Sequence, residues 1–317
     1  MPSPQPATSP AARPLDPFGV AMVIALCLSF GLNQVAIKLA IPSIPPLIQA
    51  AIRSGGAALI VALWMRWRGI AFDIRDGTLA AGVVAGLLFG LEFILIYRGL
   101  VLTAATRASL FLYTAPFYVA LGAHWFLPSD RFGLSQWIGL ALSFAGIAVA
   151  FGFPGPSADT GQIVGDLMII AAAVAWGATT VVIKASALNR ATPEKTLLYQ
   201  LLVSTPMLAI AAIVMGERIS AAPSAVALGA LAYQTIWVVS ITFVIWFAMI
   251  LRYSASRVSA FTFLTPLFGV TAGHIILGEP LTATFLVAVA MVVVGLIVVN
   301  RKSEAVKSDI ARRRSDS

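Results

Sequence analysis

Long apolar runs follow one another along this chain, and short polar or proline-containing breaks separate them. Two of these breaks, PSIPP at 42–46 and FPGPSADTG at 153–161, carry residues that favour turns. Apolar and polar positions do not alternate within the runs, so the pattern predicts helices and not barrel strands. Because about 20 mainly apolar residues cross the hydrocarbon core of a bilayer, we predict ten spanning helices, at 18–41, 46–67, 78–98, 104–127, 134–153, 164–186, 196–215, 224–248, 257–277 and 281–300.

The composition agrees with a lipid environment. Hydrophobic residues make up 59% of the 317 and charged residues 11%, whereas soluble domains carry about 25% charged residues. Spanning helices satisfy their own backbone hydrogen bonds, as lipid requires. We therefore predict an all-α membrane protein. It has a disordered leader (1–16), a first five-helix unit (17–153), a linker (154–163), a second five-helix unit (164–300) and a basic tail (301–317).

One stretch occurs twice. Residues 107–127 and 257–277 align without a gap at a spacing of 150 positions, and Arg, Ser, Phe, Pro, His and Leu coincide. The chain is therefore predicted to hold two copies of one unit. Since five helices per copy is an odd number, the second copy must cross the membrane in the opposite sense. Such inverted repeats place a shared site near the bilayer midplane, which opens to each side in turn.

The positive charges predict the orientation. With the N-terminus in the cytoplasm, 15 of the 21 Lys and Arg residues fall in cytoplasmic segments and three in external ones, as the positive-inside rule requires. Both termini are therefore expected to be cytoplasmic, and the net charge of +8 needs no nucleic-acid partner. The chain has no Asn-x-Ser/Thr sequon, which agrees with a bacterial inner membrane.

Charged residues inside the predicted spans are the first site candidates, because such groups usually face a cavity or pair with one another. Glu92 is the one acid well inside a span. Its carboxyl group either carries a proton that is coupled to transport or forms a structural ion pair with Arg53 or Lys38. Lys38 and Lys184 lie near helix ends, where we expect them to snorkel toward the interface.

Gln49 and Arg53 are four residues apart and share one face of their helix. The guanidinium group of Arg53 could bind a substrate carboxylate through paired hydrogen bonds, or it could only neutralise Glu92. The remaining substrate-binding candidates are polar or aromatic residues at other positions in the spans, namely Asn33, Tyr113, Trp176, Tyr199, Gln200, Tyr233 and Trp237. Their amphipathic side chains suit a substrate with an apolar body, and the alternative is packing between helices.

Prolines and glycines mark further special positions in the spans. Pro116, Pro206 and Pro266 interrupt helices and could be hinges, or they could be static kinks. The small residues at 55–56, 82/86/90 and 269/273 form faces that allow close helix contact.

Several kinds of chemistry find no support in the sequence. A Walker-type phosphate loop, a nucleophile elbow, an HExxH motif and any Cys/His cluster are missing. The lone Cys27 cannot form an internal disulfide. We therefore expect no catalytic residues, no metal site and no cofactor.

Several segments resemble a known family. FGLNQVAIKLA at 30–40, IQAAIRSGGAAL at 48–59 and the repeat centred on Pro116 and Pro266 resemble the EamA-type members of the drug/metabolite transporter superfamily. The resemblance implies ten-helix exporters in which the first four helices of each half surround a central cavity, while the fifth and tenth pack outside. An acidic residue after the ninth helix is present as Glu279, but the first-half counterpart reads PSDR.

Together these observations predict a secondary transporter that exports small amphipathic metabolites, amino acids foremost, by facilitated or proton-coupled alternating access. Drugs or other metabolites are alternative substrates. The other class of function is a membrane-embedded sensor or enzyme that binds a lipid or metabolite, which the inverted duplication disfavours. The partners expected are a small-molecule substrate and membrane lipid, and a single chain with both halves could work as a monomer.

Overall fold

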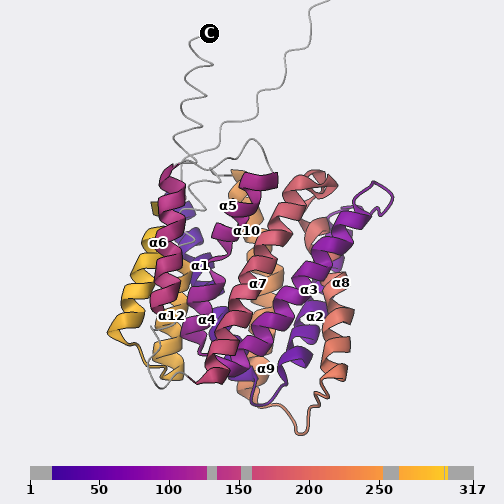
Figure 1. Cartoon of the computed structure of the whole chain (residues 1–317). Coiled ribbons are helices and arrows are strands. Elements are labelled where there is room, and N and C mark those ends of the chain that lie inside the picture. Colours follow the sequence, from indigo (N-terminus) through magenta and orange to yellow (C-terminus); the bar gives the residue numbers. More distant parts are fainter. Residues whose placement is uncertain (1–15, 127–133, 151–158, 253–263, 296, 299–317) are drawn as a thin grey trace, which may run out of the picture.

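The computed structural model describes residues 16–126, 134–150, 159–252, 264–295 and 297–298, which form a helical bundle (Figure 1). Its elements are α1 (Pro17–Ala40), α2 (Pro46–Trp67), α3 (Leu79–Leu102), α4 (Ala105–Leu112), α5 (Ala115–Phe126), α6 (Leu134–Ala150), α7 (Thr160–Ala185), η2 (Ala187–Arg190), α8 (Pro193–Val214), α9 (Ala225–Ala232), η3 (Tyr233–Thr242), α10 (Phe243–Arg252) and α12 (Leu264–Leu277). A further apolar helix spans Ala283–Gly295.

Local sequence signals begin and end several of these helices. The Asp16 side chain accepts a hydrogen bond from the backbone N–H of Gly19 at the start of α1, and Thr192 caps α8 in the same way. These caps satisfy N–H groups that have no partner inside the helix. Gly69 and Gly216 follow α2 and α8 with φ of 66° and 68°, a conformation that glycine adopts without strain.

The described helices suit a bilayer. Six segments are long and apolar enough to cross a membrane: α1, α2, α3, α7, α8 and Ala225–Trp246. Large apolar side chains also face outward, such as Leu59, which is 61% exposed, and Ile213, which is 77% exposed. Since water would not tolerate such a surface on this scale, the chain is an integral membrane protein.

Most predicted helix positions agree with the structure, and the differences have local causes. Helix α2 has the predicted bounds, whereas α7 and α8 begin earlier than predicted because Asp159 and Thr192 cap polar first turns. Helix α3 continues past Arg98 to Leu102. The predicted leader and tail, residues 154–158 of the predicted linker and residues 257–263 of the predicted helix 257–277 lie outside the described residues, apart from Asp16.

The predicted helix at 104–127 is wrong as a single element, because it breaks at Tyr113 and Thr114 into α4 and α5. Pro116 has no backbone N–H to donate. The Thr114 hydroxyl donates instead to the carbonyl of Phe111 at 2.5 Å, and the N–H of Phe117 donates to the carbonyl of Thr114. These two bonds satisfy groups that the break leaves free.

The predicted helix at 224–248 also differs, because its middle part η3 is a π-helix. The hydroxyl of Ser240 donates to the carbonyl of Thr235, five residues earlier, at 2.8 Å. π-Helical segments are rare and often occur at functional sites. An apolar sequence run carries no signal for this change of helical period.

Glycines set the closest helix contacts. Helix α3 packs on α7 and α8, and α2 also packs on α8. Gly82, Gly86 and Gly90 of α3 face side chains one turn apart on α8, namely Tyr199, Val203 and Met207. A Cβ atom at Gly86 would lie 2.5 Å from the Cβ of Val203. The predicted packing role of these small residues is confirmed.

The two halves exchange equivalent contacts. Gly31 of α1 lies against Gly269 of α12, where a Cβ would come within 2.8 Å of the Gly269 nitrogen. Gly177 of α7 lies against Val119 of α5, where the corresponding distance is 3.1 Å. Position 177 corresponds to 31 and position 269 to 119 in the sequence repeat. The first helix of each half therefore packs on the fourth helix of the other half.

The last helix of each half, α6 and Ala283–Gly295, packs on the other. A Cβ at Gly146 of α6 would lie 2.9 Å from the Cβ of Met291, and Gly295 lies against Ser143. Both helices lie at the left edge of the bundle in Figure 1. The main apolar core extends between helices of both halves, from Phe93, Phe111 and Leu201 to Val289 of the helix Ala283–Gly295.

We expect Gly86→Ala to destabilise the protein by about 1–3 kcal/mol, because the new methyl group overlaps the branched Val203 side chain. Gly229→Ala is the matched control, since nothing lies within 4 Å of a Cβ there and alanine favours a helix. Thermal unfolding of the purified protein in detergent measures both. Equal midpoints for the two variants would contradict the close α3–α8 contact.

Candidate functional site

A chain of buried amide and phenol groups crosses the interior. Gln234 of η3 donates from Nε2 to Oε1 of Gln49 in α2 at 2.8 Å. The hydroxyl of Tyr97 in α3 donates to Oε1 of Gln234 at 2.5 Å. Gln49 Nε2 donates in turn to the carbonyl of Ile37 at 3.4 Å. These residues, together with Arg53 and Glu92, are called the central polar cluster below, and they come from both halves of the chain.

Arg53 lies one turn after Gln49 and is 3% exposed. Its guanidinium carbon lies 4.1 Å from the centroid of the Phe93 ring, and the group interacts electrostatically with Tyr97 and Glu92. Its Nε atom is buried without a hydrogen-bond partner. A buried guanidinium N–H without an acceptor is costly.

Glu92 is also buried, at 6% exposure, on α3. Among the described residues it forms no ion pair within 4.0 Å, with Arg53 or otherwise. The interpretation of Glu92 as a contact ion pair therefore fails for both partners, because Lys38 pairs elsewhere and Arg53 acts on Glu92 only at longer range. The guanidinium group of Arg53 and the carboxyl group of Glu92 are thus both buried and interact without forming an ion pair within 4.0 Å.

Aromatic residues lie beside this cluster. The rings of Tyr113 and Trp176 are 5.8 Å apart and nearly perpendicular, and Tyr113 interacts electrostatically with Glu92 and Tyr233. The break between α4 and α5 begins at Tyr113, so the Pro116 region positions this side chain. Four residues predicted from the sequence thus lie close to one another: Glu92, Tyr113, Trp176 and Tyr233.

Helix η3 is tied to α1 through Ser29. The Tyr233 hydroxyl donates to the carbonyl of Ser29 at 2.7 Å, and Trp237 Nε1 donates to the Ser29 hydroxyl at 3.0 Å. Trp237 remains 44% exposed. These bonds connect the second half to the first helix.

Other candidates lie apart from the cluster or add no contact to it. The hydroxyl of Tyr199 shares a hydrogen bond with Thr78 at 3.1 Å, near the start of α3. Gln200 is buried on α8, and Asn33 is buried on α1 with its Oδ1 unpartnered. Pro206 lies inside α8.

The three prolines differ in their surroundings. The hydroxyl of Thr205, next to Pro206, donates to the carbonyl of Leu201 at 2.7 Å. Pro116 lies in the first turn of α5, and Pro266 is near the start of α12. Hydroxyl groups beside a proline kink stabilise the carbonyls that the kink frees.

Sequence reasoning missed Tyr97 and Gln234. Tyr97 lay at the predicted end of its helix, where a tyrosine is usually an interface residue, but α3 continues to Leu102. Gln234 is a fully buried amide next to Tyr233. The rule that polar groups within spans need internal partners could have found it.

Ion pairs lie at both ends of the bundle. At one end, called the Glu279 end, three acids meet three cations: Lys38 with Glu279 (3.4 Å), Arg98 with Glu217 (3.7 Å) and Arg107 with Asp166 (2.5 Å). The link between α8 and α9, which contains Glu217, lies at the bottom of Figure 1. Lys38 also donates to the carbonyl of Thr103; its side chain is 31% exposed in the last turn of α1, and its snorkelling toward the interface stays a prediction. Lys184 is exposed at the end of α7.

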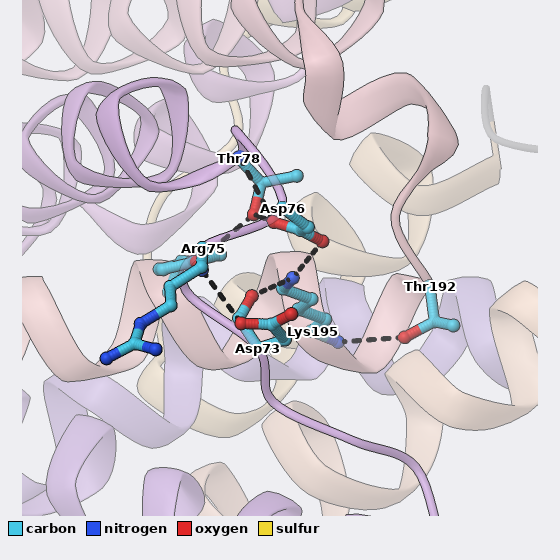
Figure 2. A network of polar contacts seen from close by, with 7 residues as sticks. Asp73, Arg75, Asp76, Thr78, Thr192 and Lys195 are labelled. Carbon is cyan, nitrogen blue, oxygen red and sulfur yellow. Dashed lines mark hydrogen bonds and ion pairs between the residues drawn. The ribbon is translucent and has the colours of Figure 1, made fainter.

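At the opposite end, called the Lys195 end, Figure 2 shows one buried lysine between the halves. Lys195 is 4% exposed and donates to the carbonyl of Asp73 and the carboxylate of Asp76, each at 2.5 Å. The Thr78 hydroxyl donates to the other Asp76 oxygen at 2.6 Å.

Hydrogen bonds from Lys195 and then Thr78 lower the pKa of Asp76 from 3.8 to about 2. Because the folded-state pKa is lowered, the stabilisation is present above the unfolded value and is lost only as the pH falls toward 2. This ion pair is therefore charged throughout the physiological range and does not act as a pH sensor.

The chain has several membrane spans, and both of its repeated halves contribute to the central polar cluster. These features define the class of polytopic membrane proteins with a site inside the helical bundle. The model of the EamA-like transporter family matches residues 17–152 and 163–301, and the chain belongs to this family. It is therefore a membrane transporter of a small molecule and not an enzyme, and its halves are duplicated EamA units.

The chain is 29% identical over 299 residues to "Uncharacterized transporter YvbV" of Bacillus subtilis (strain 168), a match that covers 91% of this chain and 93% of the relative. It is 25% identical over 300 residues to a Salmonella typhimurium protein named "Probable amino-acid metabolite efflux pump", which covers 89% and 94%. One crystal structure has the same fold, with a TM-score of 0.65 at 19% identity, over 89% of this chain and 97% of that chain.

We expect Tyr97→Phe to destabilise the protein by about 1–3 kcal/mol, because it leaves the buried Gln234 oxygen without its donor. Tyr113→Phe is the control, since the Tyr113 hydroxyl makes no hydrogen bond to another described residue. Thermal unfolding in detergent measures the difference. A Tyr97→Phe midpoint as high as that of the control would contradict the hydrogen-bond chain.

Proposed function

We propose that the protein exports small amphipathic metabolites, amino acids foremost, by alternating access to the central polar cluster. The observation that carries this proposal is the buried Arg53, whose Nε lacks a partner beside hydrogen-bonded side chains from both halves. A site built from two halves can change its exposure when one half moves against the other.

The direction of the helices supports an inverted arrangement of the halves, 17–153 and 164–300. Helix α1 ends at the Glu279 end with Lys38, whereas its counterpart α7 begins there with Asp166. Helix α2 begins at this end, and its counterpart α8 ends there just before Glu217. Together with the Lys and Arg distribution, this supports a cytoplasmic Lys195 end and an external Glu279 end in a bacterial inner membrane.

The chemistry of the cluster favours a solute with a carboxylate and an apolar part. The free Nε of Arg53 suits a carboxylate, Glu92 suits a cationic group, and Tyr113 and Trp176 offer aromatic surface. The distantly similar Salmonella protein is named as an amino-acid metabolite efflux pump. The breaks at Pro116 and Pro206 are proposed hinges, and one chain holds both halves, so a monomer suffices.

Counterflow in proteoliposomes tests transport. Protein in vesicles loaded with unlabelled amino acid should accumulate the labelled form transiently, which requires alternating access. We expect Arg53→Gln to raise the apparent KM at least about tenfold by removing a charge-assisted hydrogen bond. Arg66→Gln, which changes an exposed residue of the same helix, should leave it unchanged. If the wild type shows no counterflow with any amino acid, the proposed substrate class is wrong.

Glu92→Gln tests whether a proton is coupled to export. If Glu92 carries the proton, efflux driven by an imposed pH gradient should disappear in this variant while counterflow, which needs no net proton movement, continues. Glu194→Gln is the matched control, because Glu194 lies on α8 outside the central polar cluster. Efflux that responds to pH equally in the wild type and in Glu92→Gln would exclude Glu92 as the proton carrier.

A further inference from the structure

Every ion pair within the described residues joins the first half of the chain to the second. Three of them lie at the Glu279 end and one at the Lys195 end. If the halves move against each other during transport, the ion pairs at one end must break when that end opens and form again when it closes. The two ends therefore differ in what holds them closed.

Glu279 does more than pair with Lys38. Its Oε1 accepts a hydrogen bond from the backbone N–H of Ala105 at 2.7 Å, and its Oε2 accepts one from Thr106 at 2.8 Å. These are N–H groups at the start of α4, which has no side-chain cap of its own. Gly273 makes room for this carboxylate, because a Cβ there would lie 2.9 Å from Oε2.

Glu217 repeats the arrangement on another helix. Its Oε2 accepts hydrogen bonds from the N–H groups of Leu47 at 2.8 Å and Ile48 at 3.1 Å. These begin α2, which also lacks a side-chain cap. Its Oε1 lies 3.7 Å from Arg98. In both cases a second-half glutamate caps a first-half helix and pairs with a first-half cation.

The Lys195 end has no equivalent among the described residues. Thr192 caps α8 from within its own half. The residue after the helix-ending glycine is Glu217 in the second half but Ile70 in the first. The Asp76 side chain is 40% exposed, whereas those of Glu217 and Glu279 are 6% and 10% exposed. The ion pair at this end is single and its carboxylate is partly exposed, while hydrogen bonds from Lys195 to the carbonyl of Asp73 and between Tyr199 and Thr78 also join the halves there.

We propose that Glu217 and Glu279 are gating residues that hold the Glu279 end closed at rest, so that the central polar cluster loads from the Lys195 end. This inference rests on the alternating access proposed above. Each carboxylate binds two backbone N–H groups at a helix start, where its charge also complements the helix dipole. When this end opens, water hydrates the freed carboxylates and offsets part of the lost interaction energy. The closed state is therefore favoured, but the end can still open.

Two cysteine probes on a Cys27→Ser background can follow the two ends. Ser109→Cys reports the Glu279 end, because Ser109 of α4 is fully buried against Gly269 of α12 and becomes accessible only if these helices separate. Ala85→Cys reports the Lys195 end, because Ala85 of α3 is buried against Leu188 and Tyr199. A membrane-impermeant thiol reagent is applied to each side in turn.

We expect Glu217→Gln with Glu279→Gln to raise the labelling rate of Ser109→Cys about tenfold and to lower that of Ala85→Cys, because glutamine keeps the shape but loses the charge. Asp76→Asn should change the two rates in the opposite direction. Glu194→Gln, which neutralises an acid with no ion pair to a described first-half residue, should change neither.

Rates that rise at both probes would mean that the glutamates only stabilise the fold, and unchanged rates would mean that they do not gate. Either result overturns the proposal. Each single variant is first checked for a monodisperse profile in size-exclusion chromatography, and Glu→Asp at both positions provides a second, more conservative pair with the same expected direction.

Wild-type counterflow separates this proposal from the proposed function. Opposite changes at the two probes without amino-acid counterflow would support the gate and refute the substrate class. Normal counterflow with unchanged probes would refute the gate alone.

Discussion

Charges in a bilayer need partners inside the protein, and in this chain each half provides the partners of the other. Lys38 of the first half meets Glu279 of the second, and Lys195 of the second meets Asp76 of the first. The charged groups of these pairs therefore find their oppositely charged partners in the other half. The glycine contacts follow the same rule, because α1 packs on α12 and α7 packs on α5. Exchange between halves is thus the constraint that organises both the packing and the electrostatics.

The central polar cluster follows from this exchange. Gln234 lies between Gln49 and Tyr97, so a second-half amide completes a hydrogen-bond chain of the first half. The π-helical turn of η3 brings this amide and the Trp237 indole toward first-half helices. In the same region, and within the described part of the chain, the Nε of Arg53 has no hydrogen-bond partner, and Arg53 and Glu92 form no ion pair within 4.0 Å. Their electrostatic cost is tolerable only where solvent or a bound solute can compensate it, which is a condition that a transport site meets.

The sequence was sufficient for the parts of the fold that depend on local properties. The bounds of α2 followed from an apolar run between Pro46 and Arg68, and the small-residue face of α3 followed from helical spacing. The repeat indicated duplicated halves, in agreement with the two family matches. Sequence reasoning failed where partners are far apart in the chain. Glu217 and Leu47 are separated by 170 positions, and Tyr97 and Gln234 by 137, so no spacing rule could pair them. Local failures had a different cause: the break at Tyr113 and the π-helix depend on backbone hydrogen bonding that an apolar pattern does not record.

A symmetric backbone does not make the two ends equivalent. Duplication gives both ends the same helices, but side chains decide how strongly each end is held. After α8 the chain continues from Gly216 to Glu217, whereas after α2 it continues from Gly69 to Ile70. One carboxylate therefore distinguishes two otherwise similar turns, and it binds the start of a helix in the opposite half. A transporter with identical ends would have no structural reason to prefer one resting state, and in this chain the difference lies in a few acids at one end of the bundle.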